Sequence, residues 1–89
     1  MNAIVTAVGQ DRVGIISALC SLLAEYNINI LDITQTIMQG NFTMIMAVDL
    51  GKATVSVTEL AGALEELGRK MQITIRVQRD DIFNAMNRI

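Results

Sequence analysis

The sequence predicts one α+β domain in the order β-α-β-β-α-β, with an antiparallel four-stranded sheet and two helices on one of its faces. Two observations predict it. Four segments are rich in β-branched residues or alternate apolar with polar positions, and two segments between them repeat apolar residues every third or fourth position. Of the 89 residues, 52% are hydrophobic and 18% are charged, which is typical of a folded chain and not of a disordered one.

The first strand and helix are read from residues 3–26. Residues 3–8 are nearly all apolar, as in a central strand, and Gly9 and Gln10 are expected to end it. Asp11 is then in place to cap a helix. The apolar stripe of this helix is Ile15, Ile16, Leu19, Leu22, Leu23 and Tyr26. Asn27 follows where a left-handed residue commonly ends a helix.

A hairpin is predicted for the next segment. Residues 28–38 change to a period of two, which indicates a second strand. The turn Gln39-Gly40-Asn41 follows, because Gly and Asn tolerate the positive φ of hairpin turns. Residues 42–48 then alternate between Phe42, Met44, Met46 and Val48 on one side and Thr43, Ile45 and Ala47 on the other, which predicts a third strand.

A second helix, a fourth strand and a short tail complete the chain. Ser56 and Glu59 form a capping box, and Gly68 is expected to end the helix. Its stripe is Val57, Leu60, Ala61, Leu64 and Leu67, and the strand carries Ile73, Ile75 and Val77. This order is the ferredoxin-like sandwich. We expect a single domain over residues 1–89, with a core of residues 1–79 and a tail helix over residues 80–89. Asp80 or Asp81 would cap that helix, and Ile82, Phe83, Met86 and Ile89 lie on one side of it.

The predicted sheet is apolar on both faces. Ile4 and Val8 oppose Val5 in the first strand, and Met44 opposes Ile45 in the third. A sheet with one wet face should alternate cleanly, so the second face needs a cover. The tail helix, a partner chain or both can supply it. Because one 89-residue core is thin, we expect a homodimer.

Composition excludes several classes of function. The net charge of −2 disfavours nucleic acid as a partner, and one Cys with no His removes disulfide frameworks and nearly all zinc chemistry. No metal, no cofactor and no catalytic residues are predicted, since nothing pairs a nucleophile with a base. The longest charge-free stretch, residues 33–48, is interrupted by polar residues and is unsuited to a membrane. Without a signal peptide, the expected location is cytoplasmic.

The loop between the first strand and the first helix is the best candidate for binding. Gly9, Asp11 and Gly14 surround a helix N-terminus, whose free N–H groups suit a carboxylate or a phosphate. A purely structural role is the alternative: the glycines would turn and pack the chain, and Asp11 would only cap the helix.

The run from Gly9 to Ile16, followed by Asn27-Ile28-Asn29-Ile30, resembles the ACT domain. This is a small module that binds amino acids and other effectors on metabolic enzymes. The resemblance covers Met1 to about Gln78. Residues 31–36 and 82–86 are similar to the small stand-alone bacterial ACT proteins. Val13 stands where many ACT domains have proline, which leaves the loop less rigid.

The resemblance implies a ligand site between two subunits. One chain would contribute the loop residues Asp11, Arg12, Val13, Gly14 and Ile15. The neighbouring chain would contribute Asn29 and Asp32, at the start of its second strand. An amino acid's carboxylate could accept from the N–H groups of residues 13–15, and its ammonium could contact Asp32, Asn29 or Asp11. Asp32 is the better partner if Asp11 caps the helix. The structural alternative leaves Asn29 and Asp32 as solvated strand residues.

The expected function is therefore a non-catalytic regulatory module that binds an amino-acid-like small-molecule effector. The alternative is a dimerisation or partner-docking protein whose ligand site has lapsed. Two other families share the β-α-β-β-α-β order, but their loop motifs are not met here. The loop motif of acylphosphatases places an aromatic residue before an arginine, and residues 9–16 do not match it although they include Arg12. Copper chaperones need two cysteines in this loop, and this chain has only Cys20.

Overall fold

The computed structural model describes residues 1–80 and confirms the predicted order of elements. The strands are β1 (Asn2–Gln10), β2 (Asn29–Met38), β3 (Asn41–Asp49) and β4 (Ile73–Arg79). The helices are α1 (Ile15–Glu25) and α2 (Val57–Met71). The tail helix predicted to carry Ile82, Phe83, Met86 and Ile89 lies outside the described residues.

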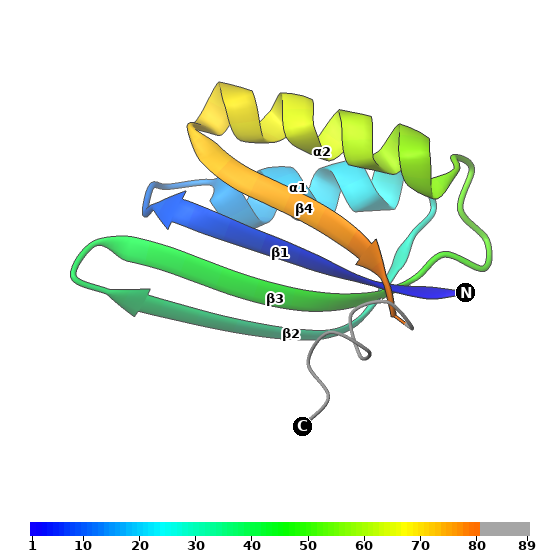
Figure 1. Cartoon of the computed structure of the whole chain (residues 1–89), viewed down its shortest axis with the longest axis horizontal. Coiled ribbons are helices and arrows are strands. Elements are labelled where there is room, and N and C mark those ends of the chain that lie inside the picture. Colours follow the sequence, from blue (N-terminus) through cyan, green and yellow to red (C-terminus); the bar gives the residue numbers. More distant parts are fainter. Residues whose placement is uncertain (81–89) are drawn as a thin grey trace.

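The four strands form one antiparallel sheet in the order β2-β3-β1-β4, the ferredoxin-like topology. Both helices lie on the same side of this sheet (Figure 1). β1 and β3 are the central strands, and β2 and β4 are the edges. The turn between β2 and β3 lies at the same end of the molecule as the loop that follows β1, and the amino terminus lies at the opposite end (Figure 1).

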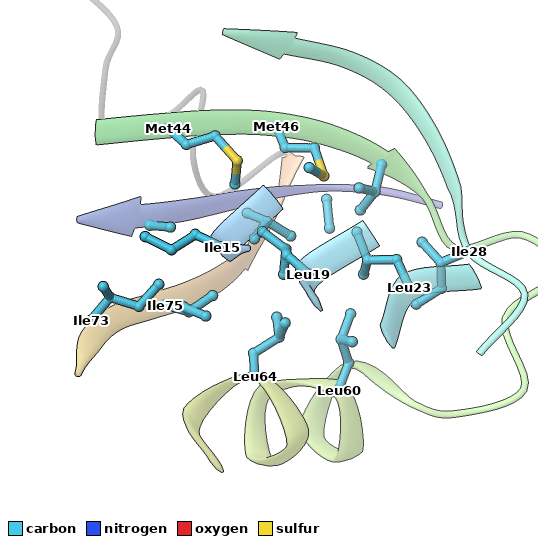
Figure 2. Close-up of a cluster of buried hydrophobic side chains, with 14 of the residues drawn as sticks. Ile15, Leu19, Leu23, Ile28, Met44, Met46, Leu60, Leu64, Ile73 and Ile75 are labelled. Carbon is cyan, nitrogen blue, oxygen red and sulfur yellow. The ribbon is translucent and has the colours of Figure 1, made fainter. Parts of the chain in front are cut away.

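A single hydrophobic core fills the space between the sheet and the helices. Leu19 and Leu23 of α1 and Leu60 and Leu64 of α2 point into it, as Figure 2 shows. The sheet contributes alternate residues of its two central strands and of β4: Ala3, Val5, Ala7, Phe42, Met44, Met46, Val48, Ile73 and Ile75. Period-two and period-3.6 patterns therefore meet in one core, as the sequence predicted.

Strand β2 contributes no buried side chain to this core. Its residues Ile33 and Ile37 pair with Met46 and Phe42, which places them on the helix side of the sheet. Even so, Ile33 is 41% exposed and Ile37 is 56% exposed. The helices thus leave one edge of their own sheet face uncovered.

The outer face of the sheet is also apolar at its centre, as the alternation predicted. Ile4 pairs with Ala47, and Thr6 pairs with Ile45, so these side chains share the face that the helices do not cover. Val8 and Ile45 on this face are 52% and 43% exposed.

Several local predictions are confirmed and others are wrong. The capping box of Ser56 and Glu59 is present, and Asn27 has the expected left-handed φ of 59°. However, α2 continues past Gly68 to Met71 and ends at a left-handed Gln72. Gly68 instead lets the helix approach β4, because a Cβ there would lie 2.6 Å from the carbonyl oxygen of Ile73.

Two further corrections concern the hairpin turn and the end of the first strand. In the hairpin turn, Gln39 and Gly40 take the positive φ values, while Asn41 belongs to β3. A two-residue turn of this kind matches the twist of its strands. The first strand does not stop at Val8 but continues through Gly9 to Gln10. A side chain at Gly9 would collide with Ile73 on β4, so this glycine permits a close strand pairing.

Candidate functional site

The loop between β1 and α1 is fastened to the rest of the domain at two points. The backbone N–H of Asp11 donates to the carbonyl oxygen of Gly40 in the hairpin turn, at 2.8 Å. The Nη1 atom of Arg12 donates to the carbonyl oxygen of Met71, the last residue of α2, at 3.0 Å. The loop is therefore anchored to both the β2–β3 turn and the end of α2. Arg12, predicted to contact a ligand, has a structural partner.

The N-terminus of α1 is capped by backbone and not by Asp11. The N-cap is Gly14, in a left-handed conformation with φ 92°, and no side chain bonds to the first turn. The prediction that Asp11 caps this helix is thus wrong, because β1 extends to Gln10 and the helix begins only at Ile15. The first bond within the helix runs from the N–H of Ala18 to the oxygen of Gly14.

The open N–H groups lie slightly later in the chain than the predicted residues 13–15. Because Ala18 makes the first helical bond, the free first-turn donors belong to Ile15, Ile16 and Ser17. The side chain of Ile15 is buried, so this residue offers a ligand only its backbone. Val13 is fully exposed beside this terminus, and a Cβ added at Gly14 would meet nothing within 4 Å. No described residue therefore crowds Gly14 at this terminus.

The structure separates Asn29 and Asp32 from this loop within one chain. Asn29 pairs with Asp49, and Asp49 pairs with Asn2 at the start of β1. The loop follows the other end of β1, which puts the two groups roughly 25 Å apart at the rise of a strand. Asp32 follows a bulge at Leu31, and its Oδ1 accepts from the N–H of Ile33 at 2.9 Å. No single copy brings all seven predicted site residues together.

Of the hollows on the surface of residues 1–80, two lie at opposite ends of the sheet. Beside the loop is a cavity of about 220 Å³, lined by Gln10, Asp11, Arg12, Met71 and Gln72. At the opposite end is a cavity of about 420 Å³, lined by Ala24, Asn27, Ile28, Asn29, Asp49 and Lys52. The smaller one contains two predicted residues and the larger one contains only Asn29.

Sequence reasoning missed Asp49 and Lys52 as neighbours of Asn29. The sequence predicts Asn27 as a helix stop and as part of the ACT resemblance, and the structure adds that its Nδ2 donates to the carbonyl oxygen of Lys52 at 2.9 Å. These residues come from two segments that lie about twenty residues apart in the sequence, so no spacing along the chain could have indicated that they meet. Only the strand register, which pairs Asn29 with Asp49, brings them together.

The described residues show no group that suggests a metal centre or a membrane span. Over residues 1–80, no three His, Cys, Asp or Glu side chains gather as metal ligands would. Cys20 is a free thiol that packs partly buried against the core. Neither helix of the described part is long and apolar enough to cross a bilayer.

A model of the ACT domain matches residues 2–78 of the sequence. A UPF0237 protein of Clostridium acetobutylicum is 52% identical over 89 residues, which is the full length of both chains. A UPF0237 protein of Pyrobaculum aerophilum is 44% identical over 87 residues, covering 98% of this chain and 97% of its own.

Solved structures show the same fold. An ACT domain protein from Streptococcus pneumoniae superposes with a TM-score of 0.82 at 35% identity, covering 93% of each chain. A glycine cleavage system transcriptional repressor gives 0.77 at 26% identity over 88% of this chain and 44% of its own. A formyltetrahydrofolate deformylase from Pseudomonas syringae gives 0.81 at 18% identity, with 26% of its own chain covered, and shows the fold alone.

Proposed function

The chain belongs to the ACT domain family, and we propose that it is a non-catalytic regulatory module that binds an amino-acid-like ligand between two copies of itself. ACT domains are commonly regulatory, and two of the matched structures carry the unit as less than half of a larger chain. For this chain, the proposed role is that of a sensor: ligand binding and association of two copies favour each other.

The observation that carries the proposal is the separation of the two halves of the expected site. The β1–α1 loop lies at one end of β1, and Asn29 lies at the other. A ligand that contacts both must therefore take the loop from one copy and the start of β2 from another. A twofold axis supplies two such sites at once.

The exposed edge of β2 is the surface through which we propose that two copies pair. Among residues 1–80, β2 pairs only with β3, and the apolar side chains Leu31, Ile33, Ile37 and Met38 along it are between 41% and 67% exposed. An exposed apolar edge is a template for pairing with another strand. Two β2 edges paired antiparallel would place the Asn29 end of one copy beside the Met38 end of the other. That second end adjoins the loop, because Gly40 accepts from Asp11.

The polar groups at this contact suit an amino acid. The free N–H groups of Ile15, Ile16 and Ser17 lie at a helix N-terminus, which favours a carboxylate. Asp32 has one carboxylate oxygen engaged by the N–H of Ile33, which leaves the other for an ammonium group. Asn29 can serve as either donor or acceptor. The dimerisation-only alternative is favoured by the engagement of Arg12 with Met71 and by the exposed Val13.

Thermal unfolding in the presence of each common L-amino acid, at several protein concentrations, tests the proposal. A ligand at 100 times its dissociation constant should add about 2.7 kcal/mol to the free energy of unfolding. Sedimentation equilibrium with and without that amino acid should show tighter association when it is present. Tight dimers that no amino acid stabilises would support the dimerisation-only alternative, and a monomer at all concentrations would contradict both.

A further inference from the structure

The cavity at the end of the molecule where α1 stops and β2 begins is lined by two opposite charges that form no ion pair with each other. Asp49 and Lys52 both line this cavity of about 420 Å³, yet they form no ion pair. On α2, by contrast, Arg69 and Glu66 do form an ion pair, at 2.6 Å. Opposite charges that share a cavity without meeting present two separate electrostatic contacts to whatever enters it.

The hydrogen bonds around these groups leave specific atoms available. Oδ1 of Asp49 accepts from the N–H of Gly51 at 2.8 Å, so the second carboxylate oxygen has no partner among the described residues. The ammonium of Lys52 and the amide of Asn29 also have no partner among residues 1–80. An acceptor, a cationic donor and an amide thus line one space. Ala24 and Ile28 supply its apolar lining.

The cavity walls are held in place by bonds between segments. Asn27 adopts φ 59° and donates through Nδ2 to the carbonyl oxygen of Lys52 at 2.9 Å. The N–H of Thr54 donates to the oxygen of Tyr26 at 2.9 Å, and its hydroxyl donates to the same oxygen at 3.3 Å. The end of α1 is therefore tied to the loop that carries Lys52. A braced cavity loses little freedom when it binds a ligand.

We propose that this cavity is a second small-molecule site, which binds the zwitterionic head of a free α-amino acid within a single chain. The ligand's ammonium lies on the free oxygen of Asp49, its carboxylate on the ammonium of Lys52, and the Asn29 amide bonds to either group. Asp49 would repel a lone anion and Lys52 would repel a lone cation. The two residues together therefore favour a molecule that carries both charges. The volume lies within the usual range of ligand pockets, roughly 300–1,000 Å³, and leaves room for a side chain.

This site differs from the interface site proposed above in needing no second copy. Asn29 lines both, but Asp49 and Lys52 belong only to the cavity, and the loop residues Asp11 to Ile15 belong only to the interface. The two proposals can therefore fail separately.

Two-dimensional amide NMR of the ¹⁵N-labelled chain, titrated with each common L-amino acid, tests the site. We expect saturable shifts at residues 27–29 and 49–52. Acetate and ethylammonium, which carry one charge each, should shift these amides far less at equal concentration. Shifts confined to residues 11–17, or none with any amino acid, would overturn the cavity proposal. Equal shifts with acetate alone would show an anion site and would also overturn it.

Substitutions of the two charged residues sharpen the test. Asp49→Asn keeps an oxygen for the N–H of Gly51 but removes the charge, and Lys52→Gln removes the ammonium. Each should weaken binding about tenfold or more, as expected for loss of one charge-assisted hydrogen bond. The matched controls Glu65→Gln and Lys70→Gln change the same charges on exposed positions of α2 and should leave affinity unchanged. If the control variants lose as much affinity as the cavity variants, the effect comes from the net charge of the protein, and the proposed site is wrong.

Discussion

The guanidinium of Arg12 donates a 3.0 Å hydrogen bond to the carbonyl oxygen of Met71, which joins the loop after β1 to the last residue of α2. The carbonyl groups at the end of a helix have no partners within it, and a cation there also interacts favourably with the helix dipole. The arginine that the ACT resemblance placed in a ligand site thus caps a helix in this chain. A ligand that moved the loop would act directly on α2.

Arg12→Met should lower the free energy of unfolding by about 0.5–1 kcal/mol, because the exposed bond to Met71 is lost while the alkyl stem is kept. Urea unfolding measures the change. Arg12→Lys retains a cation near the end of α2 and should lose less. If both variants are as stable as the parent, the bond to Met71 contributes nothing and Arg12 is available to a ligand.

Gly68→Ala should destabilise the domain by about 1–3 kcal/mol. The new Cβ would lie 2.6 Å from the carbonyl oxygen of Ile73, and backbone on both sides prevents relief. Gly62→Ala is the matched control on the same helix, since its Cβ would meet nothing within 4 Å. That variant should gain about 0.5–1 kcal/mol from reduced chain entropy. Thermal or urea unfolding of the pair gives the comparison, and equal effects of the two changes would refute the close packing of α2 on β4.

Gly14→Val should abolish ligand binding at the loop and cost about 1–2 kcal/mol of stability. The residue has φ 92°, a conformation that a β-branched side chain resists, and the added atoms would occupy the open space before α1. Gly14→Asn tolerates positive φ better and separates the two effects, because it should preserve stability while still narrowing the space. Calorimetric titration with the stabilising amino acid measures binding. A Val variant that folds and binds normally would show that the loop has only a structural role.

Ile37→Lys should weaken self-association about tenfold or more, because it sets a charge on the exposed edge strand that we propose pairs with its counterpart. Ile45→Lys introduces the same change on the outer face of the sheet and is the control. Sedimentation equilibrium of both variants distinguishes the two surfaces. Monomers produced by Ile45→Lys and not by Ile37→Lys would move the interface from the β2 edge to the outer face.

The fold was predictable because its signals are local. The alternation of Phe42, Met44 and Met46, the capping box of Ser56 and Glu59, and the left-handed Asn27 each depend on a few neighbouring residues. Local periodicity decides which face of each element is apolar, and the order of the elements then leaves few arrangements that bury those faces together.

The ends of several elements were predicted wrongly because a segment distant in the sequence packs against them. The sequence predicts Gly68 and Gly9 as stops, but in the structure both allow the close approach of Ile73 on β4. The sequence predicts Asp11 as a cap, but pairing with β3 extends β1 to Gln10, and Gly14 is the N-cap of α1. Tertiary pairing overrides a local stop signal because it adds hydrogen bonds that the local sequence does not encode.

By itself, the sequence determined the elements, their order, the core-facing residues and the ACT resemblance, because each of these follows from residue types at short range. Only the tertiary structure decided how the site residues are grouped. The strand register placed Asn29 beside Asp49 and Lys52, and the antiparallel sheet set Asn29 and Asp32 at the far end of β1 from the loop. Distances between groups far apart in the chain depend on pairing and on helix placement, which no spacing along the sequence records.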